Sequence, residues 1–280
     1  SYGGGLAATY AVSDWTFDLN YGLSRTKSWS REDTWSNHML DCQHTVIEDD
    51  MSRNSQNWAN TIFASTSWKT IKLTYNGQII SDSKSRSLSS GTLGSFTNIY
   101  KMLSPVNYHN VALRYTAPFG MTLGGDYTSY SENRSQSLFK GPDFILGSDN
   151  MQHIDRYHFY IDQEHQLDKW QLNYGTEYLH SEDNSSQKYV AYDSQDFEDK
   201  LNEDVVNVYV GTQRSFDWGL SFNISAKAEY YHSRYQHNWN FIPQLGATYY
   251  KSPKNIFQLN LSTRRVYPLY WELHGGTSHI

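Results

Sequence analysis

The sequence predicts an all-β fold, an antiparallel transmembrane β-barrel of which the chain covers roughly a dozen strands. Three observations predict it: segments that alternate between apolar and polar residues, short turns flanked by aromatic residues, and long polar stretches between the other strand ends. Aromatic residues make up 16% of the 280 residues, although the mean hydropathy is only −0.71. A membrane barrel combines these properties, because half of each strand and the loops face water.

Composition also limits the class of protein. No stretch of about 18 apolar residues is present, so the sequence predicts no transmembrane helix. The net charge of −6 is spread along the chain and gives no basic face, which argues against a nucleic-acid partner. We expect residues 1–280 to form one partial barrel domain, with no signal peptide and no plug domain in the covered chain.

Period-two alternation gives each expected strand one apolar and one polar face, because successive side chains of a strand point to opposite sides of the sheet. We expect the following residues to face lipid: Trp15, Phe17, Leu19, Leu113, Phe159, Leu172, Leu220, Phe222, Ile224 and Leu259. We expect the following residues to face the lumen: Asp18, Asn20, Arg114, Asp162, Asn173, Glu177, Asn223, Lys227, Glu229 and Asn260. These polar residues could hold a plug by hydrogen bonds, or could form a solvated face with no ligand specificity.

Aromatic residues mark each expected short turn. In a membrane barrel this row would form the periplasmic aromatic girdle, since Trp rings in particular collect where the apolar zone meets water. The girdle residues are Trp15, Trp68, Phe119, Trp170, Trp218 and Phe257. The opposite strand ends are joined by polar segments that read as long loops, at 28–57, 81–105, 132–153, 181–202 and 232–238. Tyrosines near their bases predict a second girdle: Tyr127, Tyr130, Tyr178, Tyr230, Tyr231 and Tyr235.

Near the C-terminal end, an alternating strand is followed by Tyr267-Pro268-Leu269-Tyr270-Trp271. This segment resembles the corresponding one of TonB-dependent-receptor-like outer-membrane barrels from Bacteroidetes. The resemblance implies a multi-pass protein of the bacterial cell outer membrane, with about 22 strands and a plugged lumen. It also implies uptake of a nutrient (a glycan, a peptide or a metal chelate). The implied partners are outer-membrane lipid, the TonB energising complex acting through a plug, and a possible surface lipoprotein.

The sequence offers no constellation for catalysis, so we expect no enzyme, no cofactor and no metal. The acidic run Glu48-Asp49-Asp50 lacks the spaced ligands and the glycine turn of a calcium loop. His158 falls on a polar face, and no third ligand lies nearby in sequence for a zinc site. Two alternatives to the receptor stay open: a passive diffusion porin, and a soluble all-β carbohydrate-binding module.

Overall fold

The computed structural model describes residues 1–40, 43–91, 97–140, 143–189, 196–252 and 255–263. These residues form one antiparallel sheet of 13 strands, which confirms the predicted all-β fold and its approximate strand number. The strands are β1 (Tyr2–Val12), β2 (Trp15–Leu40), β3 (Gln43–Trp68), β4 (Ile71–Gly91), β5 (Thr97–Leu103), β6 (Val106–Thr116), β7 (Met121–Lys140), β8 (Asp143–Leu167), β9 (Trp170–Tyr189), β10 (Phe197–Ser215), β11 (Leu220–Ser233), β12 (His237–Ser252) and β13 (Asn255–Ser262). None of these residues belongs to a helix with the length and hydropathy needed to cross a membrane.

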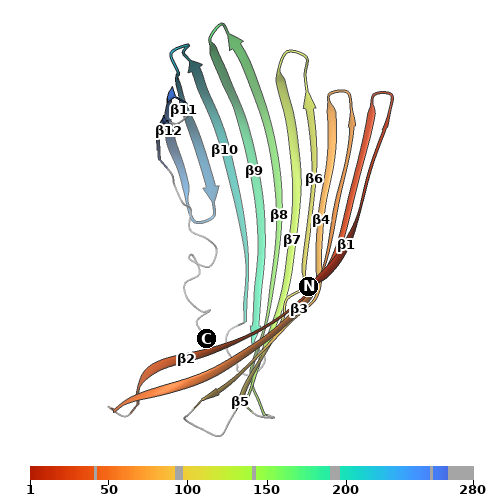
Figure 1. Ribbon diagram of the computed structural model, residues 1–280, viewed down its shortest axis with the longest axis vertical. Coiled ribbons are helices and arrows are strands. Elements are labelled where there is room, and N and C mark those ends of the chain that lie inside the picture. The colour runs from red at the N-terminus through yellow and green to blue at the C-terminus, as the bar shows by residue number, and fades with distance from the viewer. Residues whose placement is uncertain (41–42, 92–96, 141–142, 190–195, 253–254, 264–280) are drawn as a thin grey trace.

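Neighbouring strands in the sequence are neighbours in the sheet, except where β5 and β6 both lie between β4 and β7. The sheet curves along its width and stays open, since the described strands β1 and β13 do not pair with each other (Figure 1). Figure 1 shows the short turns at the top and the longer hairpins toward the bottom.

The short turns lie where the sequence predicts them. In three of them the first turn residue adopts a left-handed conformation, with φ values of 51° at Ser13, 50° at Lys69 and 54° at Asp168. In the other two described turns at this end of the sheet a glycine takes that conformation, at Gly120 and Gly219, because it carries no Cβ to clash with the backbone. The turn between β12 and β13 includes residues 253–254, which lie outside the described residues.

The prediction of long loops at the opposite strand ends is wrong for most of their length. The pairing of β2 with β3, for example, runs without a break in β2 from Trp15 opposite Trp68 to Leu40 opposite Gln43. The strands β7 and β8 form a similar long hairpin, and so do β9 and β10. These segments lose the apolar alternation but keep the backbone ladder, so their sequence looks like loop although their backbone is strand.

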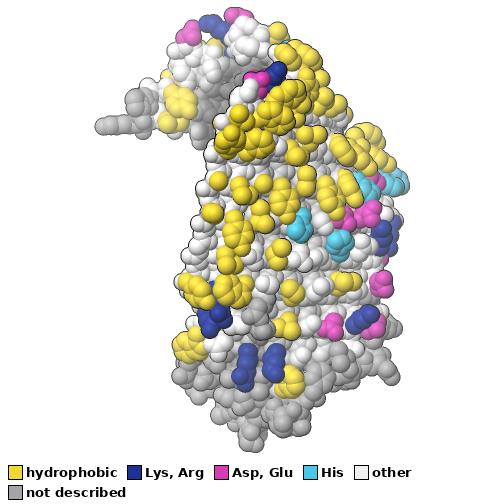
Figure 2. Space-filling model, turned by 90° about the vertical axis from the view of Figure 1, so that its right-hand side faces the viewer, with side chains coloured by type: hydrophobic (Ala, Val, Ile, Leu, Met, Phe, Trp, Pro, Cys, Tyr) yellow, Lys and Arg dark blue, Asp and Glu magenta, His cyan; other side chains and the backbone are white. Residues whose placement is uncertain are grey.

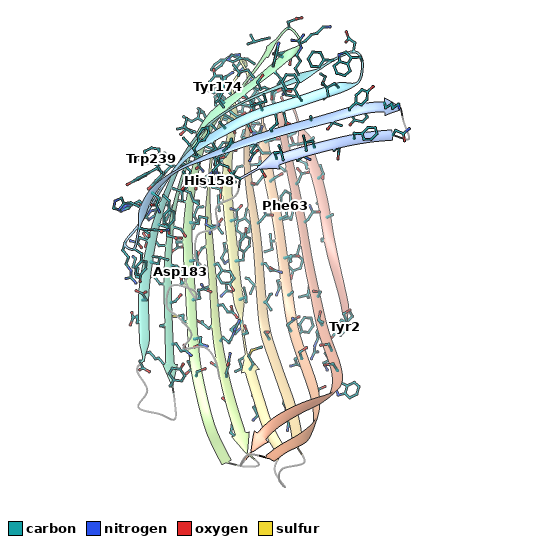
Figure 3. All side chains as sticks on the ribbon, turned by 90° about the vertical axis from the view of Figure 1, so that its left-hand side faces the viewer. Tyr2, Phe63, His158, Tyr174, Asp183 and Trp239 are labelled. Atoms are coloured by element: carbon teal, nitrogen blue, oxygen red, sulfur yellow. The ribbon has the colours of Figure 1, made fainter. Side chains whose placement is uncertain are left out.

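Following the cross-strand pairs through the sheet sorts every strand residue onto one of two faces, because directly paired residues point to the same side. Figure 3 looks onto the concave face, on which Phe63, His158 and Asp183 lie, whereas Tyr174 and Trp239 belong to the convex face. Among the described residues, the only buried hydrophobic side chains are Ala117, Leu201 and Tyr231. A single curved layer of this kind has no dry core of its own.

Candidate functional site

The convex face carries a continuous apolar band on the side of the short turns (Figure 2). Every residue that the sequence assigns to lipid lies on this face by register. Several of these side chains are about half exposed: Leu113 at 53%, Phe159 at 56% and Leu259 at 52%. An apolar surface of this extent marks contact with a membrane or with another protein. That the contact is lipid stays a prediction.

The width of this apolar band is close to that of the apolar band of membrane barrels. On β9 the band runs from Trp170 to Tyr178, about 27 Å along the strand at the usual rise of about 3.4 Å per residue. For a strand tilted by about 40°, this is roughly 20 Å along the membrane normal, close to the apolar band of about 25 Å that membrane barrels show. Beyond Tyr178, the same face of β9 continues with His180 and Glu182.

At the short-turn edge, the band ends in large aromatic rings. Trp15 and Trp68 are direct cross-strand partners, and their rings stack with centroids 5.9 Å apart. The ring of Trp170 meets that of Phe222 edge to face at 5.4 Å. At the turns themselves, Phe119 is 62% exposed and Trp218 61% exposed. These are girdle residues of the sequence analysis, and their assignment to the periplasmic side stays a prediction.

The opposite edge of the band is a row of tyrosines whose hydroxyl groups bond to polar residues; we call it the tyrosine row. Tyr127 donates to Asp155 at 2.6 Å, and Tyr178 donates to Asp204 at 2.8 Å. Two further members share the arrangement: Tyr21 with Asn60 at 2.9 Å and Tyr75 with His109 at 2.8 Å. Each ring therefore lies in the apolar band while its hydroxyl reaches the polar side, as amphipathic rings do at a membrane surface.

Two of the tyrosines predicted for this girdle lie on the wrong face. Tyr130 and Tyr231 point to the concave side, where they bond to Glu132 and Glu203. The reason is the odd or even position of a residue along its strand, which decides the face to which its side chain points. Tyr130 follows Tyr127 by three positions, so the two side chains must point to opposite faces of one strand.

Just beyond the tyrosine row, the convex face carries ionisable side chains that the sequence analysis did not single out. His180 Nδ1 lies 2.8 Å from Asp204 Oδ1, and Lys200 Nζ lies 2.8 Å from Glu182 Oε2. The hydrogen bond to Asp204 raises the pKa of His180, and the bond from Lys200 lowers the pKa of Glu182. Burial alone would raise the pKa of Asp204, but the bonds from His180 and Tyr178 lower it overall. The spacing of Tyr178, His180 and Glu182 at every second residue is the signal that predicts a shared face.

The concave face is polar across the sheet. Every residue that the sequence assigns to the lumen lies on it. Charges of both signs occur, and some pair within the face, such as Lys227 with Glu229 at 3.0 Å. His158 lies there too, with Nδ1 2.9 Å from Asp126 Oδ2. Among the described residues no group of three or more His, Cys, Asp or Glu side chains could hold a metal ion.

A hollow of about 710 Å³ lies on the concave face across β1, β2, β3, β4 and β6. The small residues Gly5 and Gly22 leave it open, and Phe63 contributes an aromatic ring to its wall. Asn20, Asn76 and Gln78 also line it, and the side-chain amides of these residues have no hydrogen-bond partner within the described part of the chain. No charged side chain lines this hollow. Free amides beside an aromatic ring suit a neutral ligand rich in hydroxyl groups.

Comparisons with known proteins give structural similarity only. No protein-family model and no curated protein matches the sequence. The alcaligin outer membrane receptor FauA from Bordetella pertussis is a solved structure similar to this chain, with 11% identity and a TM-score of 0.47 over 90% of this chain. The chain spans only 41% of the length of that receptor. The residues of the family resemblance, Tyr267, Pro268, Tyr270 and Trp271, lie outside the described residues.

Two autotransporter domains are also similar in structure. The β domain of the Bordetella autotransporter BrkA has 12% identity and a TM-score of 0.37, with 86% of this chain and 89% of that chain covered. The translocator domain of the autotransporter NalP from Neisseria meningitidis has 13% identity and a TM-score of 0.35, with 88% and 82% covered.

Proposed function

We propose that this chain forms part of the wall of a bacterial outer-membrane transport barrel of the TonB-dependent-receptor type. The observation that carries the proposal is the separation of the two faces: an apolar convex band edged by aromatic rings, and a polar concave face with charges of both signs. A soluble sandwich would bury its apolar faces against each other. Here the apolar face is exposed on the outside of the curve and the polar face lies on its inside, which is the arrangement of a membrane barrel around water.

The open sheet supports a wide barrel. In a membrane, each strand must be hydrogen-bonded on both sides, and among the described residues β1 and β13 each have one neighbour in the sheet. Further strands beside these edges would close the wall. Barrels of roughly 22 strands are plugged transporters, whereas those of 16–18 strands are open porins. A barrel larger than 13 strands is compatible with a plugged transporter and with an open porin. The resemblance of the Tyr-Pro-Leu-Tyr-Trp segment favours the plugged transporter.

The uncharged hollow on the concave face favours a glycan over a charged chelate among the nutrients of this receptor type. Phe63 offers a ring face for a sugar, and Asn20, Asn76 and Gln78 offer donors and acceptors for its hydroxyl groups. A plain diffusion porin would pass solutes without such contacts and without energy input.

Uptake of labelled neutral oligosaccharides by cells that express the protein tests the proposal. We expect uptake to stop when TonB is deleted, and to fall with Phe63→Ala but not with Phe17→Ala on the convex face. Liposomes that contain the purified protein test the alternative, a passive diffusion porin. Passive swelling in these sugars with no dependence on TonB in cells would favour the porin and end the receptor proposal.

A further inference from the structure

A group of cations lies on the convex face beyond the tyrosine row. Its members are Lys27 on β2, Arg86 on β4 and Lys101 on β5, and we call it the basic patch. Arg86 and Trp29 share Asn54 of β3 as their direct cross-strand partner, so they lie on the same face. Below the apolar band in Figure 2, Lys and Arg side chains lie at the left and centre of the view, whereas the acidic side chains at this level lie on the right, next to further Lys and Arg side chains.

The charges of the basic patch are not balanced within the described part of the chain. Arg86 and Lys101 are direct cross-strand partners, which brings two positive side chains together on one face. Like charges in this position destabilise a sheet. No described carboxylate forms an ion pair with Lys27, Arg86 or Lys101, although the ammonium group of Lys101 does lie 4.6 Å from the ring centre of Phe139. An anion between the strands would remove the repulsion.

The space for such an anion is present. Lys27, Arg86 and Lys101 line a hollow of about 610 Å³ together with Trp29 and Leu103. Trp29 is 64% exposed and Leu103 is 45% exposed. The hollow therefore offers cations and apolar surface side by side, which suits a molecule with an anionic head and hydrocarbon chains better than a small hydrophilic anion.

The basic patch begins close to the edge of the apolar band. Lys27 lies four positions beyond Leu23, where the apolar face of β2 ends, and two beyond Arg25. The Arg25 guanidinium lies 5.1 Å from the ring centre of Trp58 and donates to the Tyr2 hydroxyl at 3.1 Å. A row of Arg and Lys next to interfacial Trp and Tyr corresponds to the headgroup level of a membrane leaflet.

We propose that Lys27, Arg86 and Lys101 bind the phosphate group of a lipid in the leaflet on the side of the long hairpins. The phosphate lies between Arg86 and Lys101, where the guanidinium and ammonium groups donate charge-assisted hydrogen bonds. The acyl chains continue along the apolar band. The inference rests on the membrane placement of that band, and does not depend on which solute the barrel transports.

A matched control lies on the same face. Lys200 is also a cation beyond the tyrosine row, but its ammonium group is paired with Glu182 at 2.8 Å. It should add nothing to phosphate binding. The comparison of Arg86→Gln/Lys101→Gln with Lys200→Gln thus separates a specific site from a general effect of positive charge on the protein surface.

The test measures the thermal unfolding midpoint of the protein in neutral detergent micelles containing phosphatidic acid, diacylglycerol with the same acyl chains, or inorganic phosphate in the buffer. We expect phosphatidic acid to raise the midpoint of the native protein and of Lys200→Gln, with an apparent affinity about tenfold or more weaker in Arg86→Gln/Lys101→Gln. We expect no comparable rise with diacylglycerol or with inorganic phosphate. High salt should weaken the effect.

Three outcomes would overturn the proposal. An equal rise with diacylglycerol would show that the acyl chains bind without the phosphate. An equal rise with inorganic phosphate would show a site for a free anion and not for a lipid. Unchanged affinity for phosphatidic acid in Arg86→Gln/Lys101→Gln would place the phosphate elsewhere. Folding of this variant is checked without lipid, where loss of the like-charge contact should leave its midpoint equal or higher.

Discussion

Tyr160 lies so close to Gly124 on the neighbouring strand that a Cβ atom at residue 124 would be 2.2 Å from the Cζ atom of the Tyr160 ring. The two residues are direct partners of β7 and β8 on the concave face. Tyr209 and Gly175 repeat the arrangement on β10 and β9, where the corresponding distance to the tyrosine hydroxyl is 2.5 Å. In both pairs the missing side chain of glycine gives an aromatic ring its place against the sheet.

Gly124→Ala should therefore destabilise the protein by overpacking. We expect the free energy of unfolding to fall by about 1–3 kcal/mol, because the Tyr160 ring must leave its place. Gly4→Ala is the control, since a Cβ atom there would meet nothing within 4 Å, and it should change stability by less than about 0.5 kcal/mol. Denaturant titration in detergent measures both. Equal effects of the two substitutions would contradict this account of the Tyr160 contact.

A charge placed within the apolar band should be costly only on the convex face. Ile224 is 49% exposed on that face, and Ser225 follows it on the concave face. We expect Ile224→Arg to lower the free energy of unfolding in lipid by roughly 2–4 kcal/mol, and Ser225→Arg to have a small effect, because only the first charge enters hydrocarbon. Equal losses for both variants in a lipid folding assay would show that the two faces are not in different solvents.

The His180–Asp204 pair should make stability depend on pH. Its hydrogen bond raises the pKa of His180 above the ordinary value of 6.5, so the folded state binds the proton more tightly than the unfolded state. The resulting stabilisation is complete below the unfolded pKa and is lost as the pH rises through the folded pKa. We expect the fall in unfolding free energy over this range to be smaller in His180→Gln. An identical pH profile for the native protein and this variant would rule out the linkage.

Chemical labelling should distinguish the two faces directly. Cys42 is the single cysteine of the sequence, and Cys42→Ser provides a background for new cysteines on β6. We expect Ala112→Cys, on the concave face, to react with a charged maleimide in intact membranes. Leu113→Cys, on the convex face, should be protected by lipid and should react after the protein is transferred to denaturant. Rapid labelling at both positions in membranes would instead favour the soluble binding module.

Local patterns were sufficient to predict the alternation, the short turns and the sorting of side chains between two faces. The segment Leu220–Tyr230 shows why: its period-two pattern fixes which residues share a side, whatever strand lies next to it. The same rule explains the failure at Tyr130 and Tyr231, which lie near strand ends but have the parity of the concave face. The polar strands look like loops in the sequence for a different reason: backbone pairing leaves no hydropathy signal where both faces are wet.

The basic patch and the tyrosine contacts depend on register between strands, which one strand cannot reveal. Arg86 and Lys101 are separated by residues 87–100, part of which lie outside the described chain, and only the pairing of β4 with β5 makes them neighbours. Tyr127 and Asp155 likewise belong to different strands. Sequence reasoning could have suggested such contacts only with the turn lengths and the bulge at Gln56/Trp58 already known.

The hairpin formed by β2 and β3 keeps its backbone ladder far beyond the edge of the apolar band. Its backbone N–H and C=O groups are therefore paired between strands, whereas a loop would leave them to water. A molecule that binds this part of the hairpin meets backbone that is already ordered, so binding there costs less conformational entropy than binding to a loop.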